Sequence, residues 1–158
     1  MKRVGKLEIT LPSDREIAMT RAFHAPRELV FEAWTTPELV RRWLGAFGDW
    51  TMPVCEIDLR VGGTYRYLWT NGSMQMGLGG EFREIAAPER IVATEKYDDA
   101  WYEGDAMGTV TFTEEDGRTT LVEIVKYASK EVRDAVLQSP METGVAASFD
   151  RLEELLAS

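Results

Sequence analysis

Cysteine and histidine are almost absent from this chain of 158 residues, which has one of each, Cys55 and His24. A single cysteine excludes an internal disulfide and a metal cluster built on thiolates. Cys55 lies in the alternating run VCEIDL, which indicates a buried strand thiol, whereas a nucleophilic cysteine needs a nearby histidine. His24 suits proton transfer at neutral pH, but the sequence shows no partner near it. We therefore predict no catalytic residue, no metal and no cofactor.

Basic residues are also in short supply, because 18 Lys and Arg stand against 27 Asp and Glu and leave a net charge of −9. Such a chain lacks the concentrated basic face that binds a phosphate backbone, and an anionic membrane surface repels it. No apolar run approaches the length of a membrane span, and the stretch MKRVGKLEITLP lacks the apolar segment of a signal peptide. We expect a cytoplasmic protein that binds neither nucleic acid nor a membrane.

The sequence does contain enough apolar material for one core. Hydrophobic residues make up 44% and charged residues 28%, which is ordinary for a globular domain. No repeat, low-complexity tract or linker divides the chain. We therefore predict that residues 1–158 form a single domain.

The stretch RAFHAPRELVFEAWTTPELVRRWLG, residues 21–45, combines the end of a strand over residues 15–23 with two short helices. Pro26 and Pro37 each stand where proline is favoured, in the first turn of a helix, and Gly45 is placed to end the second.

Two tryptophans distinguish this helical pair. Trp34 and Trp43 stand on the apolar sides of the first and second helix, and Thr36 is placed to cap the second. We expect both indoles to pack inward and the helical pair to control access to the interior.

A β-rich region follows the helical pair. Alternation and turn signals predict six antiparallel strands, over residues 50–59, 64–70, 74–85, 91–97, 108–113 and 119–127. Alternation places Tyr65, Tyr67 and Trp69 on one face. Gly77 and Gly80, with a third glycine between them, favour a bulge or a strong bend.

The apolar period changes from two to between three and four in the last segment, residues 130–157. This pattern predicts one face of a long helix that begins at Ser129. Pro140 either kinks the helix or separates a first short one from it. Gly144 weakens a helix, so we expect it to lie in close contact with another element.

Together these elements predict an α+β fold, in which a strongly bent antiparallel sheet is covered on its concave face by the C-terminal helix. The space between a curved sheet and such a helix is where small apolar ligands bind. The side chains that we expect to line this cavity are Trp34, Trp43, Ile57, Tyr65, Tyr67, Trp69, Met76, Phe82, Phe112, Leu137, Met141, Val145 and Phe149.

Five motifs carry a family resemblance in the same order along the chain. They are RAFHAPRELVFEAWTTPELVRRWLG, EIDLRVGGTYRYLW, GEFREIAAPERIVAT, GRTTLVEI and METGVAASFDRLEELL. With them the chain resembles the START-like helix-grip (SRPBCC) superfamily, and within it the group similar to the C-terminal domain of the activator of the Hsp90 ATPase. The resemblance implies a helix-grip fold, with two short helices after the first strand, that binds a hydrophobic or amphipathic small molecule.

The chain also departs from the family pattern. Gly144 is followed by Val145 where the family usually has tryptophan, and Trp43 is followed by Leu44 where a second tryptophan is common. Both changes remove aromatic bulk from the cavity region. The Hsp90 activator also has an N-terminal domain for which this chain has no room, so we expect no Hsp90 interaction.

Three functions stay open, of which the first is non-catalytic binding of a small molecule in the cavity. The second is a START-like enzyme of cyclase or hydrolase type, which requires an inward polar residue of perturbed pKa. The third is a protein-interaction module related to Hsp90 co-chaperones, with an exposed apolar patch around Trp101 and Tyr102 and little internal space. Exposed edge strands also allow a homodimer.

Glu95 and Lys126 are the two charged residues whose direction alternation leaves open. Either is able to point inward as a polar anchor, but a buried charge needs a partner. The simpler interpretation places both on the solvated face of the sheet.

Overall fold

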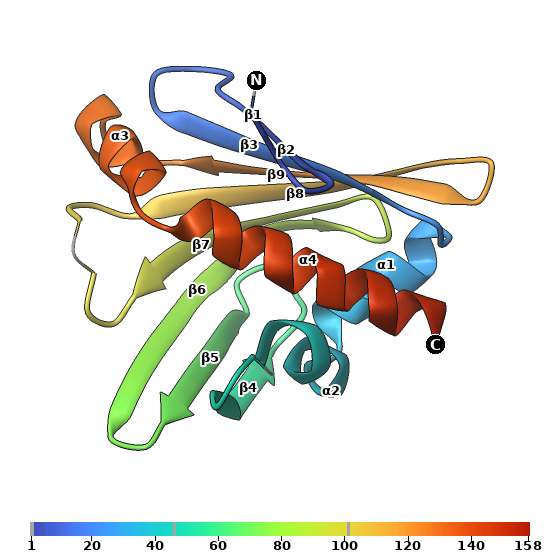
Figure 1. The fold of residues 1–158 in the computed structure, drawn as a ribbon, viewed down its shortest axis with the longest axis horizontal. Helices are drawn as coiled ribbons and strands as arrows, with labels where there is room; N and C mark the ends of the chain where they lie inside the picture. The colour runs from blue at the N-terminus through green and yellow to red at the C-terminus, as the bar shows by residue number, and fades with distance from the viewer. Residues whose placement is uncertain (1, 46, 101) are drawn as a thin grey trace.

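One curved antiparallel sheet dominates the structure, a computed structural model that describes residues 2–45, 47–100 and 102–158 (Figure 1). Its nine described strands follow the order β1-β2-β3-β9-β8-β7-β6-β5-β4. They are β1 (Lys2–Val4), β2 (Leu7–Thr10), β3 (Glu16–Phe23), β4 (Thr51–Ile57), β5 (Thr64–Asn71), β6 (Met74–Ala86), β7 (Arg90–Tyr97), β8 (Ala106–Glu115) and β9 (Arg118–Lys126).

The last six strands form a meander in which each strand pairs with the next one in the chain. They are the six strands that alternation predicts. β3 then pairs with β9 over its whole length, from Glu16 opposite Lys126 to Phe23 opposite Thr119. β1 and β2 were not expected, so the helical pair follows the third strand and not the first.

Helix α4 (Met141–Ala157) crosses the concave face of the sheet, and α3 (Lys130–Gln138) precedes it as a separate helix (Figure 1). Pro140 therefore separates two helices, which is one of the two outcomes that its position predicts. Ser129 caps α3 as expected, because its hydroxyl accepts a hydrogen bond of 3.2 Å from the Val132 amide. None of the described helices is long and apolar enough to span a membrane.

The first predicted helix is α1 (Arg27–Thr35). The second consists of α2 (Pro37–Val40) and a π-helical turn, η1 (Arg41–Gly45), that follows it directly. Trp43 is buried in η1, and its indole N–H donates to the Ala33 carbonyl over 2.9 Å, which ties η1 to α1. Gly45 ends the turn against β4, where an added Cβ would lie 2.8 Å from the Met52 Cβ.

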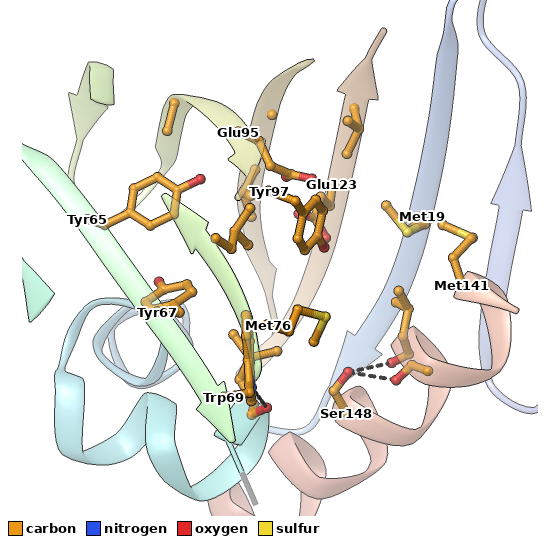
Figure 2. A pocket seen from close by; sticks show the side chains of 18 of the residues that line it. Met19, Tyr65, Tyr67, Trp69, Met76, Glu95, Tyr97, Glu123, Met141 and Ser148 are labelled. Atoms are coloured by element: carbon orange, nitrogen blue, oxygen red, sulfur yellow. Dashed lines mark hydrogen bonds between the residues drawn. The ribbon is translucent and has the colours of Figure 1, made fainter. Parts of the chain in front are cut away.

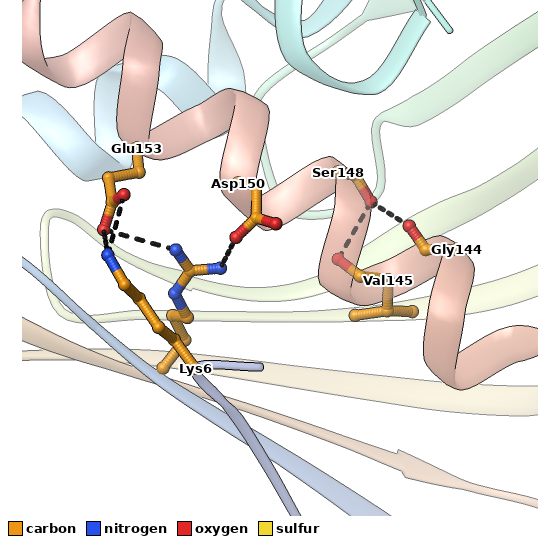
Figure 3. Close-up of polar contacts among 7 residues, drawn as sticks. Lys6, Gly144, Val145, Ser148, Asp150 and Glu153 are labelled. Carbon is orange, nitrogen blue, oxygen red and sulfur yellow. Dashed lines mark hydrogen bonds and ion pairs between the residues drawn. The ribbon is translucent and has the colours of Figure 1, made fainter. Parts of the chain in front are cut away.

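An ion-pair cluster fastens α4 to the sheet. Arg21 on β3 is buried, and its guanidinium reaches Asp150 at 2.8 Å and Glu153 at 3.3 Å. Lys6 also contacts Glu153, at 3.0 Å (Figure 3). A buried guanidinium is stable only when its charge is paired, so these carboxylates fix where α4 lies over β3.

The prediction for Gly144 was wrong, whereas the bulge predicted for the glycine-containing strand is present in β6. Gly144 has no atom within 4 Å of an added Cβ, so it makes no close contact and faces open space. The register shift in β6 lies between Phe82 and Glu84, just after the glycine run and not within it. Gly80 is still required where it stands, because an added Cβ would lie 1.8 Å from the Thr94 carbonyl oxygen.

Candidate functional site: a cavity between the sheet and helix α4

A cavity of about 780 Å³ lies between the concave face of the sheet and α4. Strands β5 to β9 supply one wall, α4 supplies the opposite wall, and α1 and η1 close one end. This volume is within the range of pockets that hold small molecules, about 300–1,000 Å³.

Ten of the thirteen side chains predicted to line the cavity do line it. They are Trp34, Trp43, Tyr65, Tyr67, Trp69, Met76, Phe82, Met141, Val145 and Phe149. Their contact with a ligand stays a prediction.

The other three predicted residues are placed elsewhere. Ile57 packs between the two apolar clusters of the core. Phe112 is buried beneath α1, where its ring contacts those of Phe31 and Trp34 edge-on. Leu137 lies on α3, which Pro140 separates from α4, and it packs on the main core.

The opening of the cavity also differs from the prediction. The most exposed lining residues are Gln75, Met76, Asp99, Pro140 and Gly144. They come from the β5–β6 hairpin, the segment after β7 and the start of α4. The helical pair instead supplies buried and half-buried wall residues, so it does not form the mouth.

Glu95 points into the cavity, so the simpler interpretation of this residue was wrong (Figure 2). It shares the inner face of β7 with Ile91 and Ala93, which also line the cavity. For Lys126 the simpler interpretation was correct, because its side chain is exposed on the solvated side of the sheet.

Glu123 is a second inward carboxyl group, and the sequence analysis missed it. It lies on β9 between Leu121 and Val125, which are both buried. In the register of the sheet Glu123 stands opposite Val110, and both line the cavity. The sequence signal is weak, because Glu123 shares its parity with Leu121 and Val125, but Val122 and Ile124 on the other face are apolar too.

Gly108 on the central strand β8 leaves room for the two carboxyl groups. It pairs with Ala93 on β7 and with Val125 on β9, so it lies between the strands that carry Glu95 and Glu123. An added Cβ at Gly108 would lie 3.8 Å from a carboxylate oxygen of Glu95. The Glu95 side chain therefore extends over the glycine toward β9.

Burial changes the acidity of both groups. It raises the pKa of Glu95 from 4.5 to about 7, because a charged carboxylate is poorly solvated there. Burial, and secondarily the nearby charge of Glu95, raises the pKa of Glu123 to about 8. Within the described residues neither carboxyl group has an ion pair or a side-chain hydrogen bond. At neutral pH the pair therefore holds protons that a solvated pair would have lost.

Tyrosines line the cavity together with the two carboxyl groups, and Figure 2 shows three of them, Tyr65, Tyr67 and Tyr97. The rings that line the cavity are Tyr65, Tyr67, Tyr97, Tyr102 and Tyr127. Tyr65 is held in place, since its hydroxyl donates to the Thr94 carbonyl over 2.8 Å and its ring centroid lies 5.2 Å from that of Tyr67. Burial, with the charge of Glu95, raises the pKa of the Tyr65 phenol, so it stays protonated.

Comparison with known families decides where this fold belongs. A family model described as activator of Hsp90 ATPase homolog 1-like protein matches residues 24–157, most of the chain. The chain belongs to this family. A search of curated protein sequences found no match.

Solved structures share the fold of this family member. A crystal structure of a Rhodobacter sphaeroides protein is 32% identical, with a TM-score of 0.90 over 96% of this chain and 98% of that one. A Chromobacterium violaceum protein is 26% identical, with a TM-score of 0.75 over 92% and 99%. An HSP90 activator from Plasmodium falciparum is 22% identical, with a TM-score of 0.65 over 90% and 96%, a likeness that concerns the fold alone.

The far end of the cavity in this family member is apolar. The rings of Trp34, Trp43 and Phe149 pack together there, with centroids 5.1–6.3 Å apart. Ser148 adds little polarity to the α4 wall, because its hydroxyl donates to the backbone carbonyls of Gly144 and Val145 in its own helix (Figure 3).

Arg151 is the one basic side chain among the described lining residues. Its Nε donates to the Trp43 carbonyl over 2.9 Å, and its guanidinium lies 5.6 Å from the centre of the Phe47 ring. Arg151 therefore belongs to the junction of α4 and η1, and it is paired with neither Glu95 nor Glu123.

Other candidate chemistry is placed outside the cavity. Cys55 is buried in β4, as its alternating run predicts, and burial raises the pKa of its thiol. His24 is exposed. The described residues contain no group of three or more His, Cys, Asp or Glu side chains that is arranged to hold a metal ion.

The exposed apolar patch considered around Trp101 and Tyr102 is placed differently. Tyr102 turns toward the cavity, where its ring contacts that of Tyr127, and Trp101 lies outside the described residues.

Proposed function

We propose that this protein binds one hydrophobic or amphipathic small molecule in the cavity between the sheet and α4. The observation that carries the proposal is the cavity of about 780 Å³ with an aromatic apolar end and a mouth beside α4. Transfer of apolar surface from water to such a wall stabilises a complex by roughly 25 cal/mol for each Å² buried. A third function, an interaction module with little internal space, is poorly matched by a cavity of this size.

Acid–base catalysis on the bound molecule is the second candidate. It is favoured by Glu95 and Glu123, two inward carboxyl groups whose pKa values of about 7 and about 8 suit proton transfer at neutral pH. An enzyme of cyclase or hydrolase type requires such a group. Binding without chemistry is the simpler proposal, since the described lining holds no nucleophile paired with a base.

Hsp90 stimulation is not part of the proposal. The Plasmodium falciparum activator is 22% identical to this chain, and likeness at that level concerns the fold. We place the protein in the cytoplasm, where a single free thiol such as Cys55 persists reduced. A homodimer through an exposed edge strand, β1 or β4, stays a proposal that a native mass measurement tests.

Filling the cavity tests the proposed function directly. Val145→Trp places an indole on the α4 wall of the cavity, where it occupies space that a ligand needs. We expect it to weaken binding of the neutral fluorophore N-phenyl-1-naphthylamine about fivefold or more, because about 1–3 kcal/mol of buried contact is lost.

The matched control is Leu29→Trp, which adds the same indole at an exposed position on α1. We expect this variant to bind the fluorophore as the wild type does. Binding that is equal in all three proteins, or no saturable binding to the wild type, would contradict the proposed cavity.

A further inference from the structure

Among the residues that the structure describes, none supplies a counter-ion at the carboxyl end of the cavity. Glu95 and Glu123 both line the cavity, and the one basic side chain in the described lining, Arg151, is engaged at η1. A buried carboxyl pair without a cation is costly to keep, since charged groups inside proteins are normally paired. The fold nevertheless directs both groups into the space that a ligand would fill (Figure 2).

We infer that the cavity selects amphiphiles with a cationic head group, an amine or a quaternary ammonium, which lies against Glu95 and Glu123 while its apolar part extends toward Trp34 and Trp43. This inference rests on the proposed function and specifies the class of its ligand.

The sheet geometry supports a single head-group site. Glu95 on β7 stands opposite Ala106 and Glu123 on β9 stands opposite Val110, so the two carboxyl groups lie diagonally on either side of Gly108 on β8, where no side chain intervenes. The Glu95 side chain extends over the glycine, because an added Cβ at Gly108 would lie 3.8 Å from its carboxylate oxygen. We place the cationic head group above Gly108, between the two carboxyl groups.

Aromatic rings complete the surroundings of a cation. Tyr65, Tyr67, Tyr97 and Tyr127 line the same end of the cavity, and Tyr65 is fixed by its hydrogen bond to the Thr94 carbonyl. The faces of aromatic rings attract ammonium groups within about 6 Å, and quaternary ammonium ions are recognised in this way. Phenols and carboxylates together favour a cation over an anion or a neutral head group.

The opposite charge is disfavoured at this end. An anionic head group would lie beside two acids and would find no basic partner there within the described lining. The titratable and charged groups that face the carboxyl pair across the cavity are Tyr65, Tyr67, Tyr97, Tyr102, Tyr127, Asp99 and Arg151. Only Arg151 among them carries a positive charge.

Cation binding is linked to proton release. Burial keeps the carboxyl pair partly protonated at neutral pH, whereas a bound cation favours the ionised form. Binding of a quaternary ammonium, which has no proton of its own, therefore releases protons from the protein, and its affinity rises between pH 6 and pH 8.

Three probes of equal chain length test the head-group preference. Octyltrimethylammonium, octanol and octanoate are titrated into the wild-type protein by calorimetry, below their micelle concentrations. We expect the cation to bind at least tenfold more tightly than octanol and octanoate to bind most weakly. Titrations in two buffers of different ionisation enthalpy are expected to show proton release for the cation alone.

The variant Glu95→Gln/Glu123→Gln keeps the shape of the site and removes its charge. We expect it to lose the tenfold preference for the cation while it still binds octanol. Glu56→Gln, on the solvated face of β4, is the matched control and should keep the preference. Because the proton-release measurement uses the wild type, the inference is tested even where the double variant does not fold.

The outcomes separate the two proposals. Binding of octanol or octanoate that equals or exceeds binding of the cation overturns the head-group inference and leaves the proposed function standing. Cation binding without proton release also overturns it. If none of the three probes binds, and N-phenyl-1-naphthylamine does not bind either, the proposed function itself fails.

Discussion

Glu95 and Glu123 owe their environment to strand alternation. Each stands at an inward position between apolar residues, so each is desolvated although its side chain is acidic. Desolvation favours the neutral acid, and the pKa values rise to about 7 and about 8. The same property links the cavity to the stability of the whole fold.

The stability of the wild type should therefore fall as pH rises from 5 to 8. The folded state binds more protons than the unfolded state in this window, because the carboxyl pKa values rise from 4.5 to about 7 and about 8. We expect a loss of roughly 6 kcal/mol in the free energy of unfolding, since each pKa unit is worth about 1.4 kcal/mol. Urea unfolding at a series of pH values measures it.

Glu95→Gln/Glu123→Gln is the control for this pH dependence. The double variant lacks the two carboxyl groups whose pKa values are raised, so its stability should stay nearly flat from pH 5 to pH 8. A wild type that becomes more stable over this window, or a variant with the same slope, would be inconsistent with buried carboxyl groups.

Alternation predicts part of this site. It puts Tyr65 and Tyr67 on one face, which lines the cavity, but it leaves the direction of Glu95 open. The expectation that a charged residue stays outside was wrong for Glu95, and Glu123 was not considered. Val122 and Ile124, which alternate with Glu123, are apolar too, so residue type in β9 does not mark the inner face.

Two glycines provide a matched test of local space. Gly80→Ala would place a Cβ 1.8 Å from the Thr94 carbonyl and 2.8 Å from the Tyr65 ring, so we expect a loss of about 2–3 kcal/mol in stability. Gly144→Ala meets open space in α4 and should add about 0.5–1 kcal/mol through helix propensity. Thermal unfolding of both variants measures whether Gly80→Ala lowers and Gly144→Ala raises the stability. Equal changes in stability would contradict the space described around the two glycines.

At the scale of elements, α4 is held over the sheet by the charge of Arg21. The guanidinium is buried on β3, whereas Asp150 and Glu153 on α4 are partly exposed. Removal of both carboxylates leaves a buried cation unpaired, which is more costly than loss of a surface ion pair.

Asp150→Asn/Glu153→Gln should accordingly lower the free energy of unfolding by about 2–4 kcal/mol. Glu154→Gln, at an exposed position one residue further along α4, should change it by less than about 0.5 kcal/mol. Chemical unfolding of the two proteins gives the comparison. Equal stabilities would mean that packing alone holds α4 in place.

The apolar periodicity of the sequence predicts the longer helices and strands better than the short elements and the connections between them. The six strands of the meander and the C-terminal helix follow from apolar spacing, whereas Pro140 allowed either a kink or a break. β1 and β2 escaped prediction because they are three and four residues long, too short for alternation to be counted. The π-helical turn η1 depends on tertiary contacts, such as the Trp43 hydrogen bond to Ala33, that no local pattern contains.

At the scale of the whole molecule, the cavity exists because a curved sheet and a straight helix cannot meet along their full length. Aromatic rings from α1 and η1 fill one end of this space. No side chain fills the end near Glu95 and Glu123 or the mouth at Met76 and Gly144, among the residues that the structure describes. The result is a space with an apolar end and an acidic end, which suits an amphipathic molecule.

The methionine methyl groups offer the most direct test of this account. Met19, Met76 and Met141 line the cavity, whereas Met52 and Met74 do not. In a spectrum of methyl-labelled protein titrated with N-phenyl-1-naphthylamine, ring currents should shift the first three signals in a saturable manner and leave the other two in place. Shifts at Met74 with none at Met19 or Met141, or no shift at all, would contradict binding inside the cavity.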